Sequence, residues 1–335
     1  MRCSAEPGIP SAESDDMSMI TARHATGATF SVLLAALAAC GNGGASGSSG
    51  SGGAGPTGGS STHAGSGGHT GGGGGALDAG TDAAPDAGRD LSGDKGAFFG
   101  ASRCAQAGVQ LCEDFESGAL DPQTWEVHGD TPVIDGAHAA RGSKALHVTK
   151  NGNGLSYIRE TKTFPAVGNT YFGRMFVYFD QLPSAPGMSY AHWTFAAASG
   201  TGTQGEIRLS GQLSGGKNLF GVGTDSGGDP TGTGDWTNSD GDPPGAPAPV
   251  PTKEWLCIEW MHKGDTSETR FWWDALEHPS LYTSASVHGG NGNPYILPQF
   301  TNVWIGWQEY QASTETFEMW IDEIAIDKER IGCVL

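Results

Sequence analysis

The stretch 173–179, GRMFVYF, alternates between two kinds of position with a period of two residues. This period is typical of a β-strand, because successive side chains point to opposite faces. One predicted face carries Met175, Val177 and Phe179, and the other carries Arg174, Phe176 and Tyr178. The stretches 206–210 and 302–310 alternate in the same way. This part of the chain is therefore predicted to form sheets.

Further short segments fit the same pattern and lie at 144–149, 156–164, 191–197, 255–262, 268–275 and 316–327. Gly, Pro, Asn and Asp separate nearly all of them, which is the punctuation expected of turns. No convincing amphipathic helix of twelve residues interrupts the series. The sequence predicts an all-β sandwich of the jelly-roll type.

Large apolar side chains are confined to the C-terminal part of the chain. All 10 Trp and all 7 Tyr lie after residue 95, whereas residues 41–75 hold 18 of the 55 Gly and no aromatic residue. Gly/Ser-rich chain cannot bury enough surface to offset its ordering entropy. We predict a leader at 1–40, a disordered Gly/Ser/Ala/Asp linker at 41–95 and one β domain at 96–335.

The leader resembles a bacterial lipoprotein signal peptide. An apolar run from Phe30 to Ala39 is too short to span a bilayer and ends in Leu37-Ala38-Ala39-Cys40. The resemblance implies lipidation at Cys40, hence export and anchoring to the bacterial cell envelope, facing the periplasm or the cell surface. An ordinary signal peptide with an incidental cysteine is the alternative.

The charge of the chain excludes one class of partner, and its composition predicts one long loop. The formal net charge is −19, so the basic footprint of a nucleic-acid-binding protein is absent. The segment 222–253 is predicted to be a long loop because it is rich in Pro and Gly. Its aspartates match no EF-hand spacing and are interpreted as a solvated acidic loop.

Four cysteines fall in the predicted domain, namely Cys104, Cys112, Cys257 and Cys333. An even number is expected of disulfides in an exported domain, and four cysteines allow three pairings. We favour Cys104–Cys112, which closes a short loop, and Cys257–Cys333, which pins the C-terminal end to a central strand. Zinc is disfavoured because no C-x-x-C pair exists.

Three segments carry a family resemblance: 111–118 (LCEDFESG), 142–148 (GSKALHV) and 320–327 (WIDEIAID). Together with Trp125, they resemble the core domain of fungal cellulose-induced proteins, which are concanavalin-like jelly rolls with bacterial lipoprotein relatives. Over residues 104–333 the resemblance implies a concave carbohydrate groove and kinship with glucuronan and alginate lyases.

The resemblance also implies a structural calcium that ties the first strand to the last. Ca²⁺ takes six to eight oxygen ligands, and Glu116, Ser143 and Asp322 match by position, with Asp114 in reserve. The alternative is that Asp114 and Glu116 only solvate a turn.

A polyuronide lyase acting by β-elimination is the function that this kinship favours. Such an enzyme needs a base for the C5 proton, a donor for the leaving oxygen and groups that neutralise the uronate. We assign His192 as base, Tyr310 as proton donor, and Arg174, Arg208 and Gln308 as carboxylate ligands. The alternatives are a structural histidine, a rim tyrosine, and an Arg208 that pairs with Glu206 or with the acidic loop. The Q-I-H and R-x-E-L-R patterns of alginate lyases are missing.

A non-catalytic carbohydrate-binding or adhesion module is the alternative function. Aromatic rings present large apolar faces to sugars at low entropy cost. The candidate platforms are Trp193, Trp236, Trp272, Trp304 and Tyr178. Both functions imply a polysaccharide partner and a monomer. A third alternative is a surface protein with no sugar ligand, whose groove would be filled.

Overall fold

A computed structural model describes residues 88–184, 190–202, 204–225, 236–238, 248–289 and 294–335. The leader, Cys40 and nearly all of the predicted linker lie outside the described residues, so lipidation stays a prediction. No helix in the described ranges is long and apolar enough to cross a membrane.

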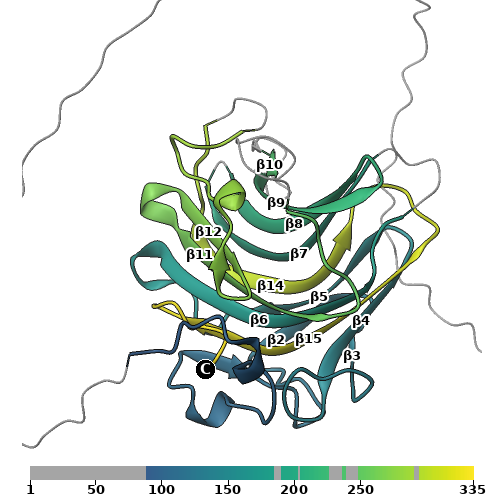
Figure 1. Ribbon diagram of the computed structural model, residues 1–335. Coiled ribbons are helices and arrows are strands. Elements are labelled where there is room, and N and C mark those ends of the chain that lie inside the picture. Colours follow the sequence, from purple (N-terminus) through teal and green to yellow (C-terminus); the bar gives the residue numbers. More distant parts are fainter. Residues whose placement is uncertain (1–87, 185–189, 203, 226–235, 239–247, 290–293) are drawn as a thin grey trace, which may run out of the picture. The chain divides into compact units, whose positions relative to one another are not determined.

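The described chain forms two antiparallel sheets that pack face to face as a jelly-roll sandwich, as predicted. One sheet has the strand order β13-β12-β11-β6-β15-β4-β3, with β1 also paired to β15. The other has the order β10-β9-β8-β7-β14-β5-β2. Figure 1 shows both sheets curving in the same sense, with β14, β7 and β8 on the inner side of the curve. We call the outward faces of the seven-stranded and eight-stranded sheets the concave face and the convex face.

The eight-stranded sheet contains β1 (Leu111–Glu113), β3 (Val133–Asp135), β4 (Ala145–Asn151), β6 (Thr170–Gln181), β11 (Trp255–Lys263), β12 (Glu268–Trp273), β13 (Leu276–Glu277) and β15 (Thr316–Asp327). The seven-stranded sheet contains β2 (Trp125–Gly129), β5 (Gly154–Glu160), β7 (Tyr190–Thr201), β8 (Glu206–Ser214), β9 (Lys217–Asp225), β10 (Trp236–Asn238) and β14 (Gln299–Glu309). The short 3-10 turns are η1 (Lys95–Ala97), η2 (Cys104–Gln106), η3 (Val167–Asn169), η4 (Gly264–Thr266) and η5 (Pro279–Leu281).

Each strand predicted from alternation is present, and the predicted segment 316–327 has the bounds of β15. The predicted loop at 222–253 was partly wrong. It includes the end of β9 and the short strand β10, which pairs Trp236 with Gly223. The parts of this segment that join the sheet, 222–225 and 236–238, contain no proline. Most of its prolines come later, in the stretch 243–251.

Tryptophan–glycine pairs between neighbouring strands fill the core. Trp193 lies opposite Gly211, and Trp260 lies opposite Gly173. A Cβ at either glycine would come within 2.2 Å of the facing indole ring, so only glycine leaves room for it. Trp193 also stacks on Trp307, with 5.2 Å between ring centroids. These large rings occupy the space between the two sheets.

The described residues before β1 and the C-terminal segment after β15 pack on the convex side. Both predicted disulfides, Cys104–Cys112 and Cys257–Cys333, are confirmed, and the second holds the C-terminal segment against β11. Arg89, which the sequence placed in the linker, donates hydrogen bonds to the carbonyl oxygens of Glu329 and Arg330. The part of the chain that packs on the sandwich therefore begins before residue 96.

Candidate functional site

A row of stacked rings crosses three strands of the concave face. The ring of His128 on β2 stacks on Tyr157 of β5, with 5.0 Å between centroids. Tyr157 stacks in turn on Trp304 of β14 at 4.6 Å. The sequence folds this way because β5 and β14 alternate, which sends Ile158 and Ile305 into the core and their neighbours outward. We call this row the aromatic ladder.

A buried carboxylate joins the aromatic ladder to the neighbouring strands. Glu206 at the start of β8 is 7% exposed and accepts hydrogen bonds from Trp304 Nε1 at 3.0 Å and Ser199 Oγ at 2.8 Å. Its other oxygen accepts from Arg208 Nε at 2.5 Å. Arg208 also pairs with Asp225 at the end of β9, with 3.2 Å between Nη1 and Oδ2. The predicted alternative pairing of Arg208 with Glu206 is confirmed.

Tyr310 lies next to this network, immediately after β14. The guanidinium carbon of Arg208 is 4.8 Å from the centre of the Tyr310 ring. The Tyr310 hydroxyl and Thr194 Oγ1 are 3.1 Å apart, and either can be the donor. The Tyr310 amide donates to the carbonyl oxygen of His192 at 3.3 Å. Tyr310, Arg208 and His192 are thus gathered in one region, as the sequence predicted.

Burial shapes the acid–base properties of this region. Burial, assisted by the charge of Arg208, lowers the pKa of His192 to about 4, so its imidazole is neutral at pH 7. Burial raises the pKa of the Tyr310 phenol above its ordinary value, although Arg208 opposes the rise. A neutral imidazole can accept a proton and a protonated phenol can donate one.

Two irregularities in strand pairing occur beside these groups. The register of β14 against β7 shifts between Ile305 and Gln308, and that of β7 against β8 shifts between Thr194 and Ala196. Bulges are common next to functional sites because they re-aim side chains. Gln308 lies opposite Thr194 at this point and is half-buried.

Comparisons with solved structures bear on the fold. A protein described as "Cellulose induced protein, Cip1" matches with a TM-score of 0.51 and 22% sequence identity, over 67% of this chain and 100% of that chain. The chain shares its fold with a cellulose-induced protein. The fold part of the predicted resemblance is therefore confirmed.

Weaker matches include an alginate lyase, AlyC3, with a TM-score of 0.37 and 11% identity over 56% of this chain and 75% of that one. Domain 4 of an extracellular arabinanase from Geobacillus stearothermophilus has a TM-score of 0.39 and 15% identity, over 67% of this chain and 94% of that domain. No family model and no curated protein matches the sequence.

One of the predicted uronate ligands lies elsewhere. Arg174 is fully buried on the convex side, because β6 belongs to the eight-stranded sheet. Its guanidinium donates to the carbonyl oxygens of Glu323 at 2.9 Å and Leu335 at 2.8 Å. Alternation correctly predicted the face of the strand that carries Arg174, but the concave face is formed by the other sheet.

Three of the predicted sugar platforms are also misplaced. Trp193 is fully buried between the sheets, where its indole donates to Asn218. Trp272 is on the convex face beneath the guanidinium of Arg330, 4.5 Å from its ring centre. Tyr178 is on the convex face too, stacked on His138 at 4.3 Å. Trp304 does lie on the concave face, but it is only 3% exposed and its ring stacks on Tyr157. The side chain of Trp236 lies outside the described residues.

Sequence reasoning missed Tyr157, His128 and the central position of Glu206. In the segment 154–160, alternation places Tyr157 on the face of the strand that points away from the core, because its neighbour Ile158 points into it. This pattern could have identified Tyr157 as a candidate. β2 is too short for a period to be read from it, so His128 carried no such signal.

The predicted calcium ligands surround one turn, residues 140–144. Glu116 accepts hydrogen bonds from the Ser143 amide at 2.7 Å and the Ser143 hydroxyl at 2.8 Å. Asp322 Oδ2 accepts from the amides of Ala140 and Arg141. The other oxygen of Asp322 is buried without a hydrogen-bond partner. Oxygen donors are what calcium prefers, and of the carboxylate oxygens of Glu116 and Asp322, Asp322 Oδ1 is the one left unpartnered. Both Glu116 oxygens accept from Ser143 and Lys144.

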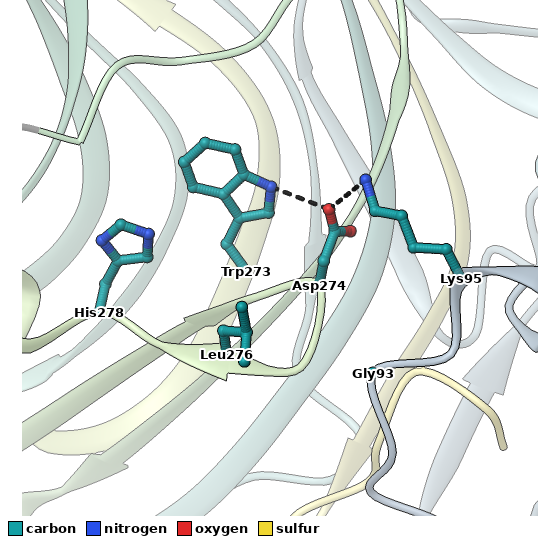
Figure 2. Close-up of a pocket in the computed structure, with 6 residues that line it drawn as sticks. All are labelled: Gly93, Lys95, Trp273, Asp274, Leu276 and His278. Carbon is teal, nitrogen blue, oxygen red and sulfur yellow. Dashed lines mark hydrogen bonds and ion pairs between the residues drawn. The ribbon is translucent and has the colours of Figure 1, made fainter.

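A separate pocket lies at the edge of the eight-stranded sheet (Figure 2), with a cavity of about 430 Å³. Asp274 there accepts from Trp273 Nε1 at 3.1 Å and pairs with Lys95 Nζ at 2.6 Å. The ring of His278 stacks on Trp273 at 5.2 Å. The carboxylate of Asp274 is thus held by Lys95 and Trp273.

Proposed function

We propose that the concave face binds a polysaccharide. The observation that carries the proposal is the aromatic ladder, His128, Tyr157 and Trp304, placed beside the polar groups of Glu206 and Arg208. Trp304 is 3% exposed and Tyr157 stacks between two rings, so the ladder presents mainly the outer edges of the half-buried Tyr157 and His128. Apolar ring edges contact the C–H groups of sugars, and charged donors and acceptors hydrogen-bond the hydroxyls. A row of rings across several strands suits a chain of sugars better than a single one.

Replacing Tyr157 by alanine is expected to weaken polysaccharide binding about tenfold, since the middle ring of the ladder is lost. Affinity electrophoresis against a panel of soluble polysaccharides measures the change. Tyr282→Ala, which removes a tyrosine that contacts Arg270 of the other sheet, is the matched control and should leave binding unchanged. Equal binding by Tyr157→Ala and the parent protein would contradict the proposal.

A polysaccharide lyase is a second candidate, favoured by the gathering of Tyr310, Arg208 and His192. In β-elimination the base takes the C5 proton, the electron pair forms the C4–C5 double bond, and the C4–O bond breaks. The leaving oxygen then takes a proton. The neutral imidazole of His192 suits the first step and the phenol of Tyr310 suits the last.

If the chain is a lyase, Tyr310→Phe is expected to slow formation of unsaturated uronates at least about 100-fold, because the proton donor is lost. The ultraviolet absorbance of the new double bond reports the rate. With His192 as base, activity should persist on the acid side until the pH approaches about 4, where the imidazole takes up its proton. An acid limb near the ordinary histidine value, or a Tyr310→Phe variant of full activity, would count against these roles.

We also infer that Glu116, Ser143 and Asp322 hold a structural calcium. Calcium at a hundredfold excess over its Kd would add about 2.7 kcal/mol to the free energy of unfolding. Its removal by a chelator should therefore lower the Tm by roughly 5 °C or more. Glu116→Gln should abolish the calcium response, and magnesium is the control ion. A Tm that calcium and chelator leave unchanged would reject the site.

A further inference from the structure

The concave face has few cationic groups. Within the described strands of the seven-stranded sheet, Lys and Arg occur only as Arg159 on β5, Arg208 on β8 and Lys217 at the exposed start of β9. The internal segments outside the described residues contain no Lys or Arg in their sequence. Among the described strands of this sheet, these three residues are therefore the cations that an anionic ligand could meet.

Both arginines are already matched by carboxylates. Arg159 pairs with Glu126, with 2.5 Å between Nη2 and Oε2. Arg208 pairs with Glu206 at 2.5 Å and with Asp225 at 3.2 Å. Three carboxylates thus face two guanidinium groups, and His192 is neutral at pH 7. The net charge of these five groups is negative, as is that of the whole chain. A polyanion would therefore be repelled.

Glu206 cannot easily release Arg208 to a ligand. One of its oxygens holds the indole of Trp304 and the hydroxyl of Ser199, and the other holds Arg208. Its side chain is only 9% exposed, and that of Arg208 only 13%. Separating such a pair leaves a poorly solvated carboxylate behind, which is costly.

We infer that the concave face is selective for uncharged polysaccharides, and that Glu206 and Asp225 set this selectivity by occupying Arg208. The inference rests on the proposed polysaccharide-binding function and names its substrate class. Arg208 and its two carboxylate partners carry no net positive charge, so they present no unpaired cation to a uronate. A uronate would have to compete with two resident carboxylates for the same guanidinium.

The test measures binding of the full chain to two classes of soluble probe by affinity electrophoresis. Hydroxyethylcellulose, arabinoxylan and galactomannan are the uncharged probes, and alginate and polygalacturonate are the anionic ones. Asp225→Asn and Glu206→Gln each remove one negative charge beside Arg208. Asp225 is 40% exposed, so its variant should fold even if Glu206→Gln does not. Glu277→Gln is the matched control, because it removes a carboxylate partner of Arg270 on the other sheet.

The parent protein is expected to bind at least one uncharged probe and neither anionic one. Asp225→Asn should gain binding to alginate of about tenfold or more, and the gain should shrink as salt is raised. Glu277→Gln should gain nothing. Binding of alginate by the parent protein, or no gain in Asp225→Asn, would overturn the inference and leave polysaccharide binding intact. If the parent protein binds no probe of either class, the proposed function is overturned together with the inference.

Discussion

A variant in which alanine replaces Cys257 and Cys333 is expected to lose about 4 kcal/mol of unfolding free energy. The two cysteines are 76 residues apart, so their bond removes much of the entropy of the unfolded chain. Both are fully buried beside Phe98 and Phe176. Loss of the bond also loosens the C-terminal segment, whose last carbonyl oxygen accepts from Arg174. Chemical denaturation of the variant and the parent protein under oxidising conditions measures the difference.

The matched control is the Cys104–Cys112 pair, which closes a loop of only 8 residues. Replacing it by alanines should cost about 2.5 kcal/mol, because a shorter loop restricts the unfolded chain less. Polysaccharide binding at 25 °C should survive in both variants, since the concave face belongs to the other sheet. Equal losses in the two variants would show that loop length does not govern the effect.

The sequence was sufficient to predict strands and the two faces of each, because the side-chain period of a strand is local. The segment 173–179 illustrates this: Met175 and Val177 lie in the core, and Arg174 and Phe176 lie on the opposite side. Alternation does not say which sheet a strand joins. Arg174 was therefore assigned to the concave face, although β6 pairs with β11 and β15 on the convex side.

The candidate site was predicted in part. The sequence named Arg208, Tyr310 and His192 together, and they do meet because β8 and β14 both pair with β7, which carries His192. The prediction of Trp193 as a sugar platform was wrong, because its ring fills the core over the facing Gly211. That cross-strand pair depends on the register between β7 and β8. The aromatic ladder depends on register too, since Tyr157 meets Trp304 only through the pairing of β5 with β14. Contacts between strands far apart in sequence are not encoded in any local period.

Glu309 provides the second large effect, and it depends on pH. Glu309 is 2% exposed, and neither carboxylate oxygen makes a hydrogen bond of good geometry. Burial raises the pKa of Glu309 from 4.5 to about 8, so the folded protein keeps a proton that the unfolded chain has already released. The stability that this group contributes is complete below about pH 4.5 and is lost as the pH rises through about 8.

We therefore compare the change in unfolding free energy that Glu309→Gln causes at two pH values. This change is expected to be about 3 kcal/mol more stabilising at pH 9 than at pH 5. This is less than the full pKa shift implies, because a buried site relaxes around the charge when the group ionises. Glutamine keeps the shape of the protonated acid and carries no charge at any pH. Denaturant unfolding of both proteins from pH 5 to 9 gives the difference, and Glu254→Gln, at an exposed glutamate, is the control. A difference between Glu309→Gln and the parent protein that stays constant across this range would mean that Glu309 ionises as an ordinary surface carboxyl, with room for water beside it.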